Sequence, residues 1–302
     1  MQAFAPGIHP RSEALVQATR DLDRGRTTAE AVDEQFGRDL DDLVRVQQEA
    51  GLDLLADGML RWQDLFRPLL EATEVLEPGP LTRFLDTNSF YRAPTATSGE
   101  PRLREPLDER YVAPLPGPRI VTLPSPYALA HGTGLPAKVV ATEVLKPQLD
   151  ALEADLVVLS EPFLAREGAG ELGELRTALE ALAGGPPLAL QVTFGDAREL
   201  LEHGLGELPV EGIGVDFYAT HATDVPQGFG KLLLAGVVDA RGSALEEPQE
   251  IAEFVSRLHD RGVERIALVP NGDLQYVSAS IAREKLARLG AARTARPKES
   301  AA

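Results

Sequence analysis

The chain contains 302 residues, of which 43% are hydrophobic and 25% are charged, and its formal net charge is −17. These proportions indicate a globular protein with a sizeable core, and the negative charge argues against nucleic acid as a partner, because phosphate binding requires clustered Lys and Arg. The lack of cysteine excludes disulfides, thiolate nucleophiles and cysteine-ligated metal sites.

The start of the chain, Met1–Gly7, is short and is interrupted by Pro6, which does not fit a signal peptide. No apolar run in the sequence is long enough to span a bilayer. We therefore expect a cytoplasmic protein that has no membrane partner.

Apolar runs that predict strands alternate along the chain with stretches of helical periodicity. The strand runs are residues 2–5, 52–58, 119–123, 155–162, 188–196, 212–217, 231–240 and 265–270, and the helical stretches are 28–50, 137–154, 173–183, 197–205, 248–260 and 281–289. The strand runs are almost continuously apolar, which is typical of parallel strands buried on both faces. About eight such strands separated by helices predict a single (β/α)8 TIM barrel over residues 1–290.

Two regions do not fit this repeat. Residues 74–118 are rich in Pro, Thr and Arg and are too long for a simple connection, so we expect an inserted segment with a functional role or a small sheet of its own. Residues 291–302 consist mostly of Ala, Arg, Lys, Pro and Ser, and they predict a disordered tail.

Polar residues follow the predicted strands, at the face where barrel enzymes place their active sites. They are His9, Arg11, Asp57, Asp64, Glu161, Gln191, Thr193, Asp196, Asp216, Asp239, Arg241, Asn271 and Asp273. Each of these side chains has an alternative role, since Asp and Asn after a strand often cap the next helix or close a turn. Their shared position predicts a polar site at one end of the barrel.

The sequence lacks the patterns of the common catalytic and metal sites. It contains no H-E-x-x-H, no G-x-S-x-G and no phosphate-binding G-x-x-x-x-G-K. A zinc site built from His9 or His221 with Asp216 has no ligand spacing in its favour. We therefore expect no metal.

Eight motifs in register resemble the cobalamin-independent methionine synthase family. "APGIHPRSEAL" is similar to its Pro-Arg opening, "AGLDLLADGMLRWQDL" to its Ala-Gly-x-Asp and Asp-Met segment, and "FLDTNSFYRAP" to its Asp-Thr-Asn motif. "LPSPYALA", "LSEPFLAREG", "LPVEGIGVDF", "LLAGVVDARGSALEEPQEIAEFV" and "LVPNGDLQYV" complete the match. Several motifs resemble the N-terminal, non-catalytic barrel of the family most, and one barrel accounts for the length of the chain.

The resemblance implies a loss of the family's zinc site, which activates a substrate thiol for methyl transfer from methyltetrahydrofolate. The family's His-x-Cys ligand pair falls on Gln191 and Thr193, its glutamate ligand on Asp216, and its later cysteine on Gly272. Family residues that the chain retains are Arg11, Asp64, Asn88, Tyr91, Arg92, Glu161 and Asp239. A thiol without zinc is only a few per cent thiolate at neutral pH, so the zinc mechanism is not expected.

Three functions follow from this interpretation. The first is a zinc-independent methyltransferase for a methylfolate-like, thiol or thioether molecule, with Asp216 and Glu161 as catalytic residues. Its substrate would contact His9, Arg11, Asp64, Asn88, Tyr91, Arg92, Tyr127, Thr193, Asp239, Asn271 and Asp273. The second is a non-catalytic binding or scaffold protein that works with a separate zinc-containing methyltransferase. The third is a metal-independent decarboxylase or lyase that holds substrate carboxylates with arginines.

Overall fold

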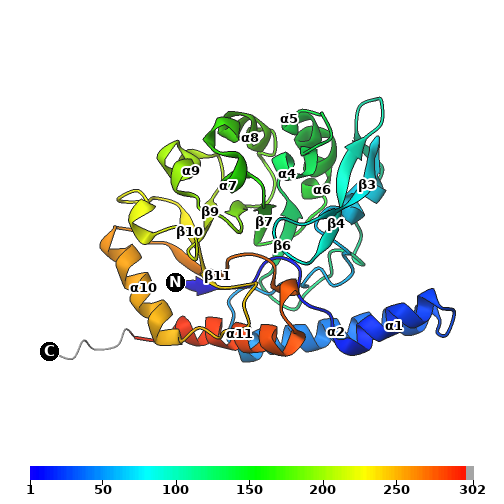
Figure 1. The fold of residues 1–302 in the computed structure, drawn as a ribbon, viewed down its shortest axis with the longest axis horizontal. Helices are drawn as coiled ribbons and strands as arrows, with labels where there is room; N and C mark the ends of the chain where they lie inside the picture. The colour runs from blue at the N-terminus through cyan, green and yellow to red at the C-terminus, as the bar shows by residue number, and fades with distance from the viewer. Residues whose placement is uncertain (297–302) are drawn as a thin grey trace.

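A curled sheet of seven parallel strands forms the centre of the molecule (Figure 1). The computed structural model describes residues 1–296. The strand order is β1 (Gln2–Ala3), β11 (Ile266–Pro270), β10 (Leu232–Val238), β9 (Gly212–Asp216), β8 (Leu188–Val192), β7 (Leu156–Glu161) and β6 (Ile120–Pro124). The predicted α/β class with a parallel sheet is confirmed.

The eighth predicted strand, residues 52–58, is present only as an isolated bridge between Leu55 and Arg119. Leu55 donates to Pro118 O and accepts from Ile120 N, both at 2.9 Å, while Asp53 N donates to Ala3 O at 2.9 Å. The Asp53 carboxylate accepts from Ala3 N at 2.8 Å, where a second strand would offer a carbonyl. The segment thus connects the two edges of the sheet, but a side chain interrupts its ladder.

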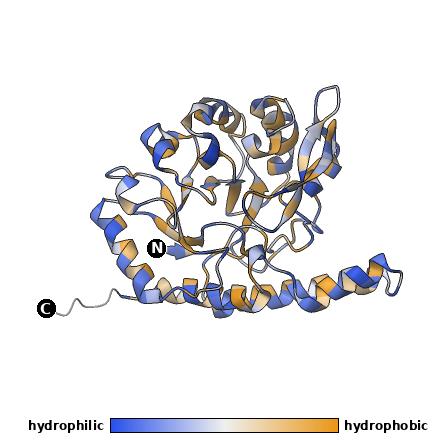
Figure 2. Cartoon of the chain, in the orientation of Figure 1, coloured by the Kyte–Doolittle hydropathy of each residue, from blue (hydrophilic) through white to orange (hydrophobic). Residues whose placement is uncertain are grey.

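Most helices cover the outside of the curled sheet, whereas the first helix extends away from it (Figure 1). Figure 2 shows hydrophobic and hydrophilic residues alternating along the helices. The helices are α1 (Glu13–Asp23), α2 (Ala29–Glu49), α3 (Arg67–Ala72), α4 (Pro126–Ala130), α5 (Ala137–Val140), α6 (Lys146–Asp150), α7 (Leu164–Glu167), α8 (Leu172–Glu180), α9 (Arg198–Glu202), α10 (Pro248–Asp260) and α11 (Ala279–Ala292). A π-helical turn over Ala141–Leu145 joins α5 to α6. Short 3-10 turns cover Ala169–Glu171, Leu205–Glu207, Ala222–Asp224 and Leu274–Tyr276.

The core has two layers. An inner cluster is formed by Phe4, Leu54, Ala56, Ile120, Leu156, Val158, Ala189, Leu232, Leu234, Ala267 and Val269. A larger outer cluster lies between the strands and the helices. Because alternate residues of a strand point to opposite faces, strands buried on both sides supply both layers, as the continuous apolar runs predicted.

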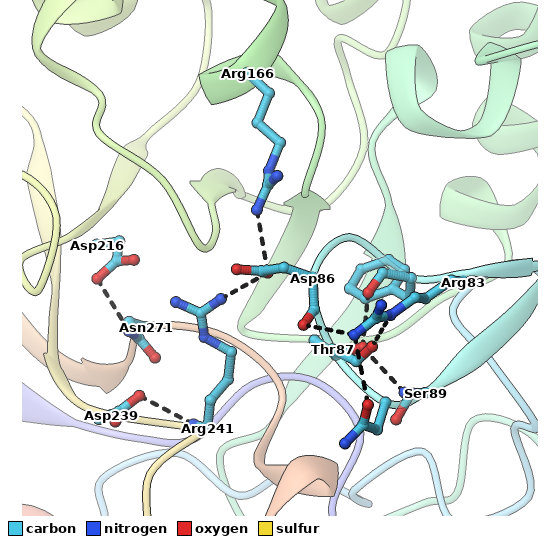
Figure 3. Close-up of polar contacts among 11 residues, drawn as sticks. Arg83, Asp86, Thr87, Ser89, Arg166, Asp216, Asp239, Arg241 and Asn271 are labelled. Atoms are coloured by element: carbon cyan, nitrogen blue, oxygen red, sulfur yellow. Dashed lines mark hydrogen bonds and ion pairs between the residues drawn. The ribbon is translucent and has the colours of Figure 1, made fainter.

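The predicted insertion, residues 74–118, forms two small antiparallel sheets. One is the hairpin of β3 (Leu76–Arg83) and β4 (Phe90–Ala96), and the other pairs β2 (Thr73–Glu74) with β5 (Arg102–Leu103). The tip of the hairpin, residues 84–89, lies over the carboxyl ends of the strands (Figures 1 and 3).

Part of the tail predicted to be disordered is ordered. Helix α11 continues to Ala292, and the Arg293 guanidinium donates to Gly51 O at 2.7 Å and lies 2.9 Å from Asp53. These contacts with residues that follow α2 hold Arg293 in place, although the composition assigned it to a disordered tail. Residues 297–302 of the predicted tail lie outside the described residues.

Candidate functional site

Asp216 and Asn271 meet at the carboxyl ends of β9 and β11. Asn271 Nδ2 donates to Asp216 Oδ1 at 3.0 Å, and Asn271 Oδ1 accepts from Ala240 N at 2.9 Å. Both side chains are buried, and Asp216 Oδ2 has no hydrogen-bond partner among the described residues. Burial raises the pKa of Asp216, against the opposing effects of the Asn271 hydrogen bond and the Arg241 charge. This pair is the centre of the predicted polar face.

Asp86, at the tip of the β3–β4 hairpin, extends over this centre between two arginines. Its Oδ1 atom accepts from Arg241 Nη1 at 3.0 Å and from Arg166 Nη2 at 3.2 Å (Figure 3). Arg166 belongs to α7, which follows β7, and Arg241 follows β10. The hairpin is therefore held to two distant positions on the rim of the sheet.

The Phe194 ring fills the space beside Gly272. An added Cβ at Gly272 would lie 2.2 Å from Phe194 Cζ and 2.6 Å from its Cε2. The Arg241 guanidinium covers the ring at 4.7 Å from its centroid. The position that corresponds to the family's later cysteine thus contacts a phenyl ring that an arginine covers.

Two other positions that the resemblance aligns with the family's zinc ligands, Gln191 and Thr193, are engaged in structural contacts. Gln191 Nε2 donates to Pro270 O at 2.8 Å, and Thr193 is buried with its backbone N–H bonded to Glu161 O at 3.1 Å. Within residues 1–296, no three or more His, Cys, Asp or Glu side chains are grouped in a way that could hold a metal ion. The residues present at this mouth do not fit the zinc site that the resemblance implies.

Glu161 is buried at the end of β7 and caps the following helix. Its Oε1 atom accepts from Phe163 N at 2.9 Å and from Leu164 N at 3.1 Å, and its Oε2 atom accepts from the Ser125 hydroxyl. Burial raises its pKa, with these hydrogen bonds opposing the shift. The capping alternative therefore describes Glu161, although its carboxylate also lies at the predicted face.

Asp273 joins the same end of the sheet to the start of the chain. Its Oδ1 atom accepts from Ile8 N at 3.1 Å, and its Oδ2 atom accepts from Gln275 Nε2 at 3.2 Å. Burial raises the pKa of Asp273 to about 6. Ionisation of Asp273 is therefore less favourable in the folded protein than in the unfolded chain, and this predicts a pH effect on stability.

An acid whose folded pKa exceeds its unfolded value loses stability as pH rises through the folded pKa. For Asp273 this interval runs from its ordinary value of 3.8 to about 6. Asp273→Asn removes the ionisation and keeps an acceptor for Ile8 N. We expect the variant to gain about 2 kcal/mol relative to the native protein between pH 4 and pH 8, measured by urea unfolding at both pH values. An unchanged difference at the two pH values would contradict this assignment.

His9 and Arg11 turn away from the mouth. His9 lies among residues of α2 and α11, including Leu43 and Arg283, and burial together with Arg283 lowers its pKa to about 4. Arg11 donates to Leu60 O at 2.7 Å and to Trp62 O at 3.0 Å. In this structure they anchor the loop before α1.

The hairpin residues predicted as ligand contacts hold the insertion in place. Asp64 Oδ2 accepts from Arg92 N at 3.0 Å, and its Oδ1 atom accepts from Phe66 N and Arg67 N at 2.9 and 2.8 Å. Tyr91 is buried in an aromatic cluster with Phe66, Phe84 and Phe163. Arg92 Nη1 donates to Gly79 O, and Asn88 is exposed and accepts from Arg83.

Tyr127 and Asp239 lie on the rim. The Tyr127 hydroxyl donates to Glu167, which also contacts His131 Nε2 at 2.7 Å. Asp239 Oδ1 accepts from Arg241 N at 3.0 Å, so Asp239 positions the arginine that binds Asp86. The structure thus brings Asp216, Asn271 and Asp239 near Arg241, while Asp64, Tyr91 and Arg92 support the hairpin.

The Asp86, Arg166 and Arg241 side chains meet over the centre of the mouth (Figure 3). Cavities of about 330 and 310 Å³ lie elsewhere, one between α2 and residues 109–114 and the other between residues 217–218 and α10.

Known proteins match both the sequence and this architecture. Residues 137–262 match the family described as "Cobalamin-independent synthase, N-terminal domain". A 5-methyltetrahydropteroyltriglutamate–homocysteine methyltransferase of Mycobacterium bovis is 30% identical over 211 residues, which are 62% of this chain and 27% of that protein. The chain is thus similar to the cobalamin-independent methionine synthase family, as a distant homologue. The resemblance to the family's N-terminal domain is confirmed.

The matched region spans about a quarter of the length of these curated methionine synthase relatives, which include one from Mycobacterium leprae at 29% identity. A solved B12-independent methionine synthase from Shewanella, in complex with selenomethionine, superposes with a TM-score of 0.74 at 18% identity, covering 88% of this chain and 89% of that one. A Listeria monocytogenes structure described as a B12-independent methionine synthase gives 0.71 at 14% identity and covers 97% of both chains. These structures show that this chain shares their fold.

No helix among residues 1–296 is both long and apolar enough to cross a membrane.

Proposed function

We propose that this chain is a ligand-binding member of the methionine synthase family that does not perform zinc-dependent methyl transfer itself and that works with a separate zinc-containing methyltransferase. The observation that supports this most is the Phe194 ring beside Gly272, where the family's later zinc-ligating cysteine would stand. Asparagine, glutamine and threonine at the neighbouring positions are bonded within the protein and offer no thiolate or imidazole.

The binding role follows from the polar centre that remains at the mouth. A (β/α)8 barrel with residues 52–58 in the eighth strand position would place Asp216, Asn271 and Arg241 around one axis. The hairpin tip covers this centre through exposed contacts, and a small molecule can compete for such contacts more easily than for packed core residues. Methylfolate-like, thiol and thioether molecules are the first ligands to examine.

Two assays test this proposal. The purified chain alone is incubated with homocysteine and 5-methyltetrahydropteroyltriglutamate, with and without added zinc, and methionine formation is measured. We expect none, whereas addition of the chain to a zinc-containing family member from the same organism changes that protein's kcat/KM at least about twofold, a modest coupling. Methionine formation by the chain alone, or no effect on the zinc-containing protein, contradicts the proposal.

One observation favours zinc-free methyl transfer as a second candidate. Asp216 is buried, one of its carboxylate oxygens has no partner among the described residues, and burial raises its pKa, which together suit a general acid or base. If the chain alone transfers a methyl group, Asp216→Asn is expected to lower kcat about 100-fold or more. A variant that keeps its rate eliminates this role for Asp216.

A further inference from the structure

Arg166 and Arg241 direct their guanidinium groups at one carboxylate oxygen above the mouth. Asp86 Oδ1 lies 3.2 Å from Arg166 Nη2 and 3.0 Å from Arg241 Nη1. In the sheet, β8 and β9 separate the strands that precede these arginines, so the two groups approach Asp86 from different sides (Figure 3). Guanidinium groups match carboxylates in charge and in hydrogen-bond geometry.

Arg241 is held in place independently of Asp86. Its guanidinium covers the Phe194 ring at 4.7 Å, and its backbone N–H donates to Asp239 Oδ1 at 3.0 Å. A group that is already ordered loses less conformational entropy when it binds a ligand. Arg241 is therefore already ordered before an anion binds.

Asp86 occupies this site through two exposed ion pairs. Its side chain is 62% exposed, and ion pairs that exposed contribute little to stability. Leu85, the preceding residue, has a φ of 50°, a conformation that residues other than glycine rarely adopt. A dissolved carboxylate can therefore compete with Asp86 for the two arginines.

Nearby acids restrict the charge of such a ligand. Asp216 interacts electrostatically with both Arg241 and Asp239, and Asp239 accepts from the Arg241 backbone N–H. These carboxylates repel a ligand with a charge of −2 more strongly than a ligand with a charge of −1. A single carboxylate suits the site, and a phosphate dianion does not.

We infer that Arg166 and Arg241 form a binding site for a small monocarboxylate, and that Asp86 is an internal carboxylate that the ligand replaces when the hairpin tip moves. This inference rests on the proposed ligand-binding role of the mouth. The ligand class is a small monocarboxylate, and the hairpin tip that carries Asp86 covers its site.

The test is a titration of the full chain with propionate, with propionamide as an uncharged control and with inorganic phosphate as a dianion. The Nε–Hε signals of Arg166 and Arg241 are followed by ¹H–¹⁵N NMR. Asp86→Asn is expected to tighten propionate binding about three- to tenfold, because it removes an exposed competitor. Adding Arg241→Gln to Asp86→Asn is expected to weaken binding about tenfold, and Arg166→Gln is expected to act in the same direction.

Asp33→Asn is the matched control, because Asp33 also lies between two arginines, 2.5 Å from Arg61 and 3.9 Å from Arg110. We expect its affinity for propionate to equal that of the native protein. The inference is overturned if Asp33→Asn gains propionate binding equal to that of Asp86→Asn, if propionamide or phosphate binds Asp86→Asn as tightly as propionate does, or if Asp86→Asn leaves the affinity unchanged. The titration contains neither methyl donor nor partner protein, so its failure is distinct from a failure of the proposed function.

Discussion

Replacing Gly272 with alanine is expected to lower the free energy of unfolding by about 2 to 3 kcal/mol, because the new methyl group would overpack the Phe194 ring. Three ring atoms of Phe194 lie within 2.2 to 2.7 Å of the position of that methyl carbon. The buried ring cannot move freely, since Arg241 covers it and Tyr276 packs against it edge-on with centroids 5.5 Å apart. Urea unfolding monitored by circular dichroism measures the loss.

A double-mutant cycle assigns this loss to the ring. Phe194→Ala creates a cavity and is itself expected to cost about 3 kcal/mol, but Gly272→Ala added to it should cost at least about 1 kcal/mol less than in the native protein. Gly173→Ala is the control, because Gly173 is exposed in α8 with nothing near its Cβ position, and alanine there should stabilise the helix. Strict additivity of the two changes would show that Phe194 does not fill this position.

Replacing Lys285 with methionine is expected to destabilise the protein by about 3 to 5 kcal/mol, since it leaves a buried carboxylate without its cation. The Lys285 side chain is fully buried, and its Nζ atom donates to Ala244 O at 2.6 Å and to the Glu246 carboxylate at 3.0 and 3.1 Å. Glu246 also accepts from Asp239 N and Tyr218 Oη, both at 2.8 Å. This network holds the loop that carries Arg241.

The contribution of the unpaired charge is separated by a second change. Glu246→Gln keeps an acceptor for Asp239 N and removes the charge, so the double variant should be more stable than Lys285→Met alone. Arg198→Met, in an exposed pair with Glu202, is the control and should change stability by less than about 1 kcal/mol. If Lys285→Met and the double variant unfold at the same urea concentration, the buried ion pair does not support this loop.

The helices and strands were largely predictable because their patterns are local. Thr28 was expected to start the helix that ends before Gly51, and it does cap α2 by accepting from Ala31 N. Helix α1 was not predicted, because its cap, Ser12, is fixed by Asp39 from α2, which lies 27 positions later in the sequence. The strand predicted at residues 52–58 does not form for a similar reason, because the Asp53 carboxylate accepts the hydrogen bond from Ala3 N that a strand carbonyl would otherwise accept.

The candidate site was predictable only where position along a strand decides it. Asp216 and Asn271 are 55 residues apart and meet because both follow parallel strands of one sheet. His9 and Arg11 were placed there by the same rule but turn toward α2, since β1 ends at Ala3 and Gly7, with a φ of 87°, redirects the chain. Asp86 lay in a recognised motif, but its partners, 80 and 155 residues away, could not be identified without the folded hairpin.

The zinc content of the 302-residue chain tests most directly whether this protein lacks the family's zinc site. The protein is purified, equilibrated with one and with five equivalents of Zn²⁺, dialysed, and analysed by inductively coupled plasma mass spectrometry, with a zinc-containing family member treated in parallel. We expect well under one tenth of an equivalent to remain on this chain, because no thiolate or imidazole replaces the family's ligands at Gln191, Thr193 and Gly272. One tightly held equivalent that Asp216→Ala removes would contradict the account.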